Sequence, residues 1–322
     1  MEILITGGAG YIGSHVSHLL IDKGYKITII DSLITGNKNL IPKKANFIKC
    51  DISNIKKIRN ILKRKNFQIV LHFAGLIRVD ESVKFPKKYI FNNYYKSKLF
   101  IQNCIQNGVK NIIFSSTAAV YGNPKKKSVN ESDKLKPLNA YAKSKLMIEK
   151  YILSENKKDN LNYIILRYFN VAGADEKMRT GLISKKSTHL IKILSEVASK
   201  KKKKLLINGN NYKTIDGTPV RDFIFAEDAA EAVVKLLNST YEGVINVGTG
   251  NISIYNYTND SLLRSFNVAT NTTDLSVSGN ELYLSLRDSD GSVLIQNDTQ
   301  YYILISAGAV LGSNPPKRRH LD

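Results

Sequence analysis

Short runs of apolar and β-branched residues alternate, in the first half of the chain, with stretches whose apolar residues recur every three or four positions. Helical spacing of this kind predicts four long helices, at residues 11–24, 53–65, 87–107 and 139–157. The apolar runs between them lie at residues 2–6, 26–31, 46–50, 68–74, 111–116 and 162–169. Strands that alternate with helices predict a parallel sheet with helices on both faces, which is a doubly wound α/β domain.

The alternation loosens between residues 171 and 220, where we expect one helix near 186–200 and a short strand at 205–209. A helix and a strand return to the earlier pattern within residues 221–250. We therefore expect the doubly wound domain to span residues 1–170 and to be completed by 221–250. Residues 171–220 would form a smaller α/β lobe.

The last 70 residues, 253–322, differ in composition from the rest. The first 250 residues contain 37 lysines, whereas the last 72 contain only Lys317. The stretch "ELYLSLRDSDGSVLIQ" alternates apolar and polar residues, which predicts a β-hairpin that turns at "DSDG". The tail is therefore expected to be rich in β-strands and atypical for the domain before it, and its role stays unassigned.

The formal net charge of +21 raises the possibility of a nucleic-acid ligand. The excess is mostly lysine spread along the chain, with runs only at residues 125–127 and 200–204, and these runs lack the interleaved aromatic residues of a single-strand groove. Solvated lysines are the better interpretation. There is no apolar run of membrane-spanning length and no signal-peptide pattern, so we expect a cytoplasmic protein without a membrane contact.

The first segment that indicates a binding site is "ITGGAGYIGSH", which includes the end of the first expected strand and the start of the first expected helix. Gly7, Gly10 and Gly13 would let the backbone approach a pyrophosphate, and the helix N-terminus supplies N–H groups and a positive dipole end. The second strand ends at Asp31, whose carboxylate can accept bonds from ribose hydroxyls and would repel a 2′-phosphate. This arrangement predicts a Rossmann domain that binds NAD rather than NADP. The two cysteines, Cys50 and Cys104, have no metal-ligand spacing, and no metal site is expected.

Three tyrosines are followed by a lysine four positions later, namely Tyr94, Tyr121 and Tyr141. A glycine and a proline interrupt the stretch between Tyr121 and Lys125, so that pair need not share a helix face. The pair of Tyr94 and Lys98 follows no cluster of hydroxyl residues.

Tyr141 and Lys145 lie on one face of an expected helix. They also follow a strand that ends in the hydroxyl residue Thr117, at the sheet edge where open α/β sheets bind ligands. A free tyrosine has a pKa of about 10, and a nearby ammonium favours its phenolate. We therefore predict Tyr141 as a catalytic base, with Lys145 and Thr117 as its partners.

The chain resembles the extended short-chain dehydrogenase/reductase family, and within it the UDP-glucose 4-epimerases. The resemblance covers residues 1 to about 252 and rests on the segments "GGAGYIGSH", "DSLITGN", "HFAG", "FSSTAAVYG", "YAKSK", "RYFNVAGA", "DGTPVRDFI" and "INVGTG". It implies C4 epimerisation of a UDP-hexose through a 4-keto sugar, with NAD as a tightly held cofactor and a homodimer as a common assembly.

The resemblance also assigns residues to the cofactor and the substrate. Together with the glycine turn, the residues implied to line the NAD site are Gly7, Gly10, Tyr11, Ile12, Gly13, Asp31, Asp51, Ile52, Phe73, Ala74, Gly75, Asn93, Ser115 and Phe169. Asn170, the backbone near Leu190, and Arg221 would contact the UDP part. For Arg221 a surface ion pair with Asp222 or Glu227 is the alternative.

Three features of the sequence bear on this implication. Where many family members have a lysine, two positions after "HFAG", the chain has Ile77 followed by Arg78. Ala118 and Ala119 stand where the related 4,6-dehydratases carry an Asp-Glu pair, which favours epimerisation over elimination of water. The tail has no convincing counterpart of the family's last substrate-binding segment. One hypothesis is therefore an active epimerase, and the alternative is an NAD-binding but catalytically impaired protein with a foreign C-terminal segment.

Overall fold

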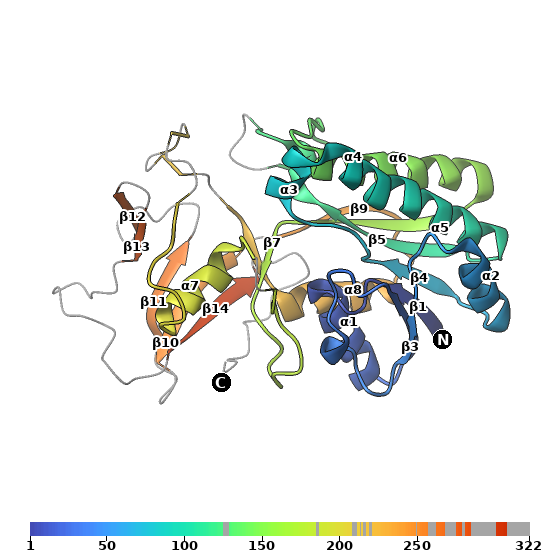
Figure 1. The fold of residues 1–322 in the computed structure, drawn as a ribbon, viewed down its shortest axis with the longest axis horizontal. Helices are drawn as coiled ribbons and strands as arrows, with labels where there is room; N and C mark the ends of the chain where they lie inside the picture. Colours follow the sequence, from blue (N-terminus) through green and yellow to red (C-terminus); the bar gives the residue numbers. More distant parts are fainter. Residues whose placement is uncertain are drawn as a thin grey trace. The chain divides into compact units, whose positions relative to one another are not determined.

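The computed structural model describes residues 1–124, 129–184, 187–207 and 221–248, five residues between 211 and 218, and the backbones of five strands after residue 249 (Figure 1). The chain divides into two compact units. The first comprises Met1–Phe169 and Ala229–Val247, and the second comprises Asn170–Asp228 and Gly248–Asp322. Within the part of the chain that the structure describes, no helix is long and apolar enough to cross a membrane.

A seven-stranded sheet forms the centre of the first unit, and all of its neighbouring strands pair in parallel. Its strand order is β3-β2-β1-β4-β5-β6-β9. In chain order these strands are β1 (Glu2–Thr6), β2 (Lys26–Asp31), β3 (Asn46–Lys49), β4 (Ile69–His72), β5 (Asn111–Thr117), β6 (Asn162–Tyr168) and β9 (Gly243–Val247). The sheet reverses its order between β1 and β4, so the expected doubly wound fold is confirmed.

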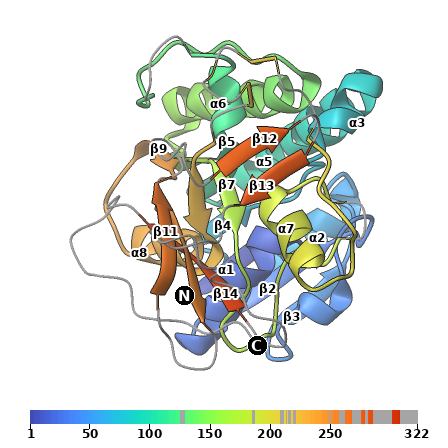
Figure 2. The ribbon, with the colours of Figure 1, turned by 90° about the vertical axis from the view of Figure 1, so that its left-hand side faces the viewer.

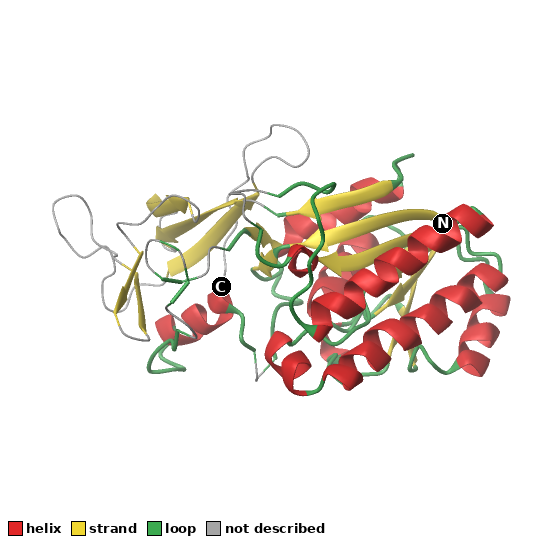
Figure 3. Ribbon diagram, turned by 90° about the horizontal axis from the view of Figure 1, so that it is seen from above, coloured by secondary structure: helices red, strands yellow, loops and turns green. Residues whose placement is uncertain are grey.

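Helices cover both faces of this sheet (Figures 1 and 3). Figure 1 shows α1 (Tyr11–Asp22) and α8 (Ala226–Leu237) on one face and α2 (Ile55–Arg64), α5 (Lys96–Gln106) and α6 (Ala140–Asp159) on the other. Shorter helices are α3 (Val79–Lys84), α4 (Pro86–Tyr89) and the 3₁₀ turns η1 (Lys38–Leu40) and η3 (Ala118–Tyr121).

Local sequence explains where α6 begins and ends. The Asn139 side chain accepts a hydrogen bond from the Ala142 N–H at 2.9 Å and so caps the first turn. Asn160 ends the helix in the left-handed conformation, with φ of 52°. Helix α6 therefore starts one residue before Tyr141, so that both Tyr141 and Lys145 lie in its first two turns.

The core of the first unit lies between the sheet and the helices α2, α5 and α6. Apolar residues from the central strands, such as Leu4, Val70 and Ile165, are fully buried there. They pack against helical residues that include Phe100 and Ile148. The continuous apolar runs of the sequence are the mark of strands buried on both faces, as the parallel sheet requires.

The second unit contains shorter elements. Strand β7 (Asn170–Ala172) pairs in parallel with β8 (Phe223–Phe225), and α7 (Leu190–Ala198) begins at a residue that packs against the apolar side chains of these strands. The helix expected near 186–200 is thus present. The strand expected at 205–209 is wrong for residues 205–207, which form no strand although Leu205 is buried, while 208 and 209 lie outside the described residues.

Strands follow in the tail as well. Figures 1 and 2 show β10 (Gly250–Asn256) side by side with β11 (Leu262–Asn267) and β14 (Tyr301–Ala307), and both pairings are antiparallel. A separate hairpin joins β12 (Leu275–Ser278) to β13 (Glu281–Leu284). The expected turn at "DSDG" lies outside the described residues, and the strand before it pairs with the segment that precedes it.

Candidate active site

The glycine turn between β1 and α1 requires glycine at two positions. Gly7 has a φ of +74°, and a Cβ added to it would lie 2.5 Å from the Ala74 backbone nitrogen. A Cβ on Gly13 would lie 2.3 Å from the Gly7 carbonyl oxygen, to which the Gly10 N–H donates at 3.0 Å. The turn therefore has no room for a side chain at Gly7 or Gly13, and it places the start of α1 directly after β1.

The first residues of α1 follow this turn without a side-chain cap, because the N-cap is Gly10. Tyr11 and Ile12 open the helix and are half-buried, and the Tyr11 ring lies edge-on to His15 with 5.1 Å between ring centroids. Burial raises the pKa of the Tyr11 phenol, which keeps it neutral. The helix N-terminus thus offers backbone N–H groups and its dipole to an anion at the carboxyl end of β1.

Asp31, at the end of β2, lies next to this turn. One carboxylate oxygen accepts from the Ala9 N–H at 3.0 Å and the other from the Leu33 N–H at 2.8 Å. The loop after β2 closes on the same carboxylate, since a Cβ on Gly36 would be 2.9 Å from its Oδ1. The side chain is therefore buried and fixed at the edge of the glycine turn, where a ribose hydroxyl would meet it.

Asp51 and Ile52 follow β3 and have different surroundings. The Asp51 carboxylate accepts from Ser53 and, at 2.6 Å, from the Lys96 ammonium. Burial raises the pKa of Asp51, but the bonds from Lys96 and Ser53 outweigh this and hold it below its usual value. The Ile52 side chain is buried in the core, so its backbone is the part that a ligand could reach.

The loop after β4 brings Phe73, Ala74 and Gly75 toward α6. The Phe73 N–H donates to the Thr6 carbonyl at 3.0 Å, which continues the sheet beyond its last strand residue. A Cβ on Gly75 would lie 3.4 Å from both the Asn93 Oδ1 and the Lys145 Nζ. This loop therefore packs directly on the predicted catalytic lysine.

Asn93 lies in a π-helical segment, η2 (Ile90–Tyr95), between α4 and α5. Such segments are rare and often occur at functional sites. Its buried amide accepts from the Leu76 N–H at 2.8 Å and donates to the Leu76 carbonyl at 2.9 Å and to Ser144 at 3.2 Å. Ser144 in turn donates to the Tyr141 carbonyl. Asn93 thus links the loop after β4 to the first turn of α6.

The structure brings Thr117, Tyr141 and Lys145 together at the carboxyl end of β5. The Lys145 ammonium is buried, donates to the Ser115 carbonyl at 2.7 Å and lies 5.0 Å from the Phe114 ring centroid. Burial lowers the pKa of Lys145 to about 8, and the Glu149 carboxylate opposes this. Burial raises the pKa of the Tyr141 phenol, and a hydrogen bond with the Thr117 side chain opposes this. At pH 7 the site thus holds a neutral phenol and a charged lysine whose pKa lies below its usual value.

The other two tyrosine and lysine pairs have different surroundings. Lys98 lies over the Tyr151 ring, 5.4 Å from its centroid, and Tyr94 packs edge-on against Tyr95. The Tyr121 hydroxyl is buried between Arg167, from which it accepts, and Asn246, to which it donates. Its partner in the sequence pattern, Lys125, lies outside the described residues.

Phe169 follows β6 in the first unit, whereas the predicted UDP contacts lie in the second unit. The Phe169 N–H donates to the Val247 carbonyl at 2.9 Å. In the second unit, the Asn170 amide donates to the Asp222 carbonyl at 2.7 Å, and Leu190 is the first residue of α7. Arg221 is exposed just before β8.

Comparison with known proteins decides the family. Residues 3–248 match the sequence model described as "NAD dependent epimerase/dehydratase family". A UDP-glucose 4-epimerase of Azospirillum brasilense is 40% identical over 253 residues, which are 77% of this chain and 73% of that protein. The chain belongs to the NAD-dependent epimerase/dehydratase family.

Solved structures of epimerases share the fold. The UDP-glucose 4-epimerase of Bifidobacterium longum, solved with NAD⁺ and UDP, has a TM-score of 0.73 and 30% identity, with 83% of this chain and 80% of that chain covered. The UDP-Glc/GlcNAc 4-epimerase of Campylobacter jejuni has a TM-score of 0.67 and 37% identity, with coverages of 83% and 80%. The expected family and the expected cofactor, NAD, are thereby confirmed.

The first unit fits this cofactor on its own evidence. A Cβ at Gly7 or Gly13 would collide with the Ala74 nitrogen or the Gly7 carbonyl oxygen, so glycine is required for the tight turn that leads into the N-terminus of α1, and the fixed carboxylate of Asp31 stands at the edge of the same turn. Within the described residues, no group of three His, Cys, Asp or Glu side chains could hold a metal ion. The individual NAD and UDP contacts expected of this epimerase-family chain remain predictions.

The departure after "HFAG" has a local explanation. The Arg78 guanidinium forms an ion pair with Asp80 at the protein surface, and the backbone N–H of Arg78 donates to the Tyr89 hydroxyl at 3.1 Å. Ile77 is exposed. Ala118 and Ala119 open the η3 turn, where the Ala119 N–H donates to the Thr117 hydroxyl oxygen at 3.2 Å. No acid or base stands at these two alanines.

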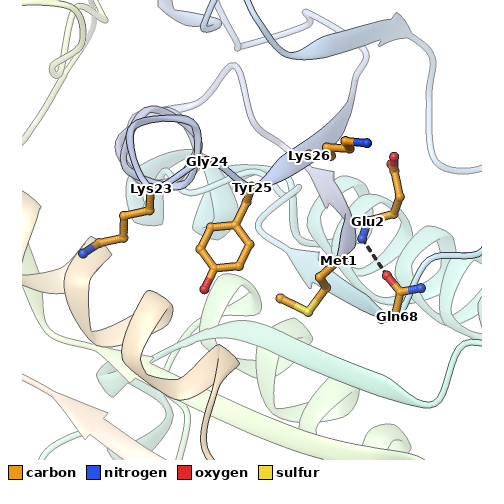
Figure 4. Close-up of a pocket in the computed structure, with 7 residues that line it drawn as sticks. All are labelled: Met1, Glu2, Lys23, Gly24, Tyr25, Lys26 and Gln68. Carbon is orange, nitrogen blue, oxygen red and sulfur yellow. Dashed lines mark hydrogen bonds between the residues drawn. The ribbon is translucent and has the colours of Figure 1, made fainter.

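A surface hollow lies at the amino ends of the strands, opposite the carboxyl ends where the predicted site residues lie (Figure 4). It is lined by residues at the amino ends of β1, β2 and β4, among them Glu2, Lys26 and Gln68, and the Glu2 N–H donates to Gln68 there. Open parallel sheets bind ligands at their carboxyl ends. None of the predicted site residues lines this hollow.

Sequence reasoning missed several buried polar residues beside the site. Glu149 and Arg167 form an ion pair behind Lys145, and His72 connects β4 to β1 and α5. Glu149 lies four residues after Lys145, at the spacing that separates Lys145 from Tyr141, so helical periodicity could have drawn attention to it. Nothing in the sequence indicates that Arg167 and His72 meet this region.

Proposed function

We propose that this chain interconverts a UDP-hexose and its C4 epimer, with UDP-glucose and UDP-galactose as the first candidates. The observation that carries the proposal is the convergence of Thr117, Tyr141 and Lys145 at the carboxyl end of β5, in a chain whose relatives are named UDP-glucose 4-epimerase. The family model ends at residue 248, so the tail stays without an assigned role. The relatives give no support to the alternative of an impaired NAD-binding protein.

The proposed chemistry assigns one task to each of the three side chains. Tyr141 removes the proton of the sugar 4-hydroxyl and later returns it. Thr117 holds the same oxygen through its hydroxyl, and Lys145 supplies the positive charge that favours the phenolate of Tyr141. NAD supplies the hydride acceptor and donor for C4. Between the two half-reactions the 4-keto sugar turns its other face toward the same groups.

We propose that the cofactor is held by the glycine turn, the start of α1 and the loops after β2 to β6. The residues are Gly7, Gly10, Tyr11, Ile12, Gly13, Asp31, Asp51, Ile52, Phe73, Ala74, Gly75, Asn93, Ser115 and Phe169. The UDP group would be held by Asn170, the backbone at Leu190 and the guanidinium of Arg221, which suits a diphosphate. An ion pair of Arg221 with Asp222 or Glu227 is the competing role for that side chain.

The two alanines of η3 favour epimerisation over dehydration. Elimination of water from a 4-keto sugar needs an acid and a base close to C5 and C6, and the side chains of Ala118 and Ala119 can act as neither. Return of the hydride to the 4-keto sugar, which completes the epimerisation, is therefore the favoured outcome.

We also propose a homodimer, formed by the helices next to the catalytic strand. Phe91, Tyr95 and Leu99 follow one another at intervals of four residues along η2 and α5 and are 59%, 51% and 43% exposed. The Phe91 and Tyr95 rings lie 6.5 Å apart, so they share a face. Such a row of exposed apolar side chains suits a second copy of the same helices, because a two-fold interface pairs one patch with itself.

We place the protein in the cytoplasm, because both of its cysteines are free and buried, as is usual in a reducing compartment.

Incubation of the purified protein with UDP-galactose, and separately with UDP-N-acetylgalactosamine, tests the reaction. We expect the 4-epimer of one or both sugars to appear without added reductant. A protein that binds NAD and yet forms no epimer from either sugar would refute the proposal.

A further inference from the structure

A buried ion pair lies directly behind the predicted catalytic lysine. Glu149 is 1% exposed and Arg167 is 4% exposed. The Arg167 Nη2 donates to the Glu149 Oε2 at 2.8 Å, and its Nε lies 3.2 and 3.3 Å from the two carboxylate oxygens. Burying two charges costs free energy that their attraction only partly returns, so such a pair is weak evidence for stability alone. Its position suggests a role in the site.

Glu149 continues the row of site residues along α6. It lies one helical turn after Lys145 and two turns after Tyr141, so all three share one face of the helix. The Ser116 hydroxyl donates to the Glu149 carboxylate. Ser116 stands between Ser115, whose carbonyl accepts from Lys145, and Thr117, which bonds to Tyr141. Glu149 therefore holds the strand segment that presents both partners of the catalytic pair.

Arg167 is held in turn from its other side. Its Nη1 donates to the Tyr121 hydroxyl at 2.8 Å and to the Glu131 carbonyl at 3.0 Å, and the guanidinium lies over the Tyr121 ring. Ser116 and Arg167 are also direct neighbours in the pairing of β5 with β6. The pair is thus anchored to two strands and one helix, and it cannot turn away from Lys145.

The charged and titratable groups around Lys145 are few in the described part of the chain. Tyr141 and Glu149 face it from α6, His72 from β4, and Arg167 lies behind Glu149 on β6. His72 is buried and uncharged, because burial and the nearby Lys145 ammonium lower its pKa to about 3. Glu149 is therefore the group of opposite charge that favours a charged Lys145.

We propose that Glu149, fixed by Arg167 and Ser116, is a positioning residue that keeps Lys145 charged and directed at the Ser115 carbonyl, and so sets the upper pH limit of the reaction. The inference rests on the proposed function for its link to catalysis. Its electrostatic part concerns Lys145 alone and can be measured without substrate.

Nuclear magnetic resonance of cofactor-free protein with ¹³C-labelled lysine ε-carbons measures the titration of Lys145, whose signal the Lys145→Met variant identifies. In the wild type we expect a midpoint near 8, far below that of exposed lysines. In Glu149→Gln the midpoint should fall by about one pH unit or more, since loss of a nearby opposite charge shifts a pKa by this amount. Asp159→Asn removes the same charge about 21 Å from Lys145 along α6, and it should leave the Lys145 midpoint unchanged.

The pH profile of turnover with UDP-galactose gives the second readout. In Glu149→Gln the alkaline limb of kcat should move to lower pH by a similar amount, and Asp159→Asn should keep the wild-type profile. A purely structural role predicts a uniform loss at all pH values and an unchanged lysine midpoint. That result would overturn the proposal.

A second variant keeps the test decisive if Glu149→Gln does not fold, because removal of one partner leaves Arg167 buried and uncompensated. The double variant Glu149→Gln with Arg167→Met removes both charges and retains a group that can accept from Ser116. We expect a downward shift of the Lys145 midpoint that is smaller than in Glu149→Gln, because loss of the Arg167 cation partly offsets loss of the nearer Glu149 carboxylate. Folding is checked by circular dichroism, and an unchanged midpoint would refute the proposal. A wild type without epimerase activity would refute the proposed function, whereas the lysine titration would still decide the role of Glu149.

Discussion

Burial of Tyr141 and Lys145 determines which of these two side chains is charged at a given pH. Burial disfavours charge on both groups, so it raises the pKa of Tyr141 and lowers that of Lys145 to about 8. At pH 7 the cofactor-free protein therefore holds a neutral phenol and an ammonium. The proposed base is the phenolate of Tyr141, which the positive charge of bound NAD would favour further.

Replacement of Tyr141 by Phe tests the proposal that Tyr141 is the catalytic base, because it removes only the phenol oxygen. We expect turnover to fall by about 10² to 10⁴-fold, the usual contribution of a general acid–base group. Bound NAD, measured by absorbance after gel filtration, should be retained, because the ring still packs in the same place. Tyr94→Phe is the matched control from the sequence pattern and should keep wild-type turnover. Equal losses in the two variants would contradict the choice of Tyr141.

Some of the site could be predicted from the residues and some could not. Thr117, Tyr141 and Lys145 follow from a helical spacing and a strand end, which are both local properties. Glu149 shares that spacing, but its partner Arg167 lies 18 residues later on another strand. Only the tertiary fold shows that the two charges meet, because sequence pattern carries no information on pairing between distant elements.

At the scale of elements, the parallel sheet was predictable because its strands are continuous β-branched runs buried on both faces. The stretch at 87–107 was expected to be one helix, whereas it contains α4, the π-helical η2 and α5. Strands β7 and β8 have three residues each, too few to show a period. At 205–207 an apolar composition suggested a strand, but Leu205 is buried and Leu206 exposed without strand pairing.

The junction of β1 and α1 allows a prediction about backbone space. Gly7→Ala places a Cβ 2.5 Å from the Ala74 nitrogen at a φ of +74°, so it should displace the loop after β4 and weaken NAD binding at least about tenfold, a change of about 1.4 kcal/mol. Gly24→Ala, at the end of the same helix, has a similar φ of +82° and no atom within 4 Å. It should lower stability slightly and leave NAD affinity intact, as titration calorimetry can measure. If both variants bind NAD with equal affinity, the clash at Gly7 does not affect cofactor binding and the prediction is wrong.

His72 connects three elements and gives the fold a pH dependence. Its ring nitrogens bond to the Thr6 hydroxyl on β1 at 2.5 Å and to Ser97 on α5 at 2.8 Å, and its ring stacks between Phe100 and Phe114. Because its pKa is lowered to about 3, its contribution to stability is complete above pH 6.5 and is lost as pH falls toward 3.

Urea unfolding between pH 7 and pH 5 measures this contribution. The free energy of unfolding should fall by about 2 kcal/mol over this range on account of His72 alone. In His72→Gln, whose side chain does not titrate, that part of the slope should vanish, although the variant is less stable at pH 7. A wild-type slope in the variant would show that His72 does not carry the effect.

At the scale of the whole molecule, the exposed row of Phe91, Tyr95 and Leu99 predicts the assembly. An aspartate at position 99 would place a charge within the apolar row, and a two-fold interface would bury that charge on both copies. We therefore expect Leu99→Asp to halve the mass measured by light scattering after gel filtration, while NAD stays bound. Leu206→Asp, at an apolar residue that is 60% exposed in the second unit, should keep the wild-type mass. A wild-type protein that is already monomeric at micromolar concentration would exclude the dimer, and a dimer that survives Leu99→Asp would place its interface elsewhere on the chain.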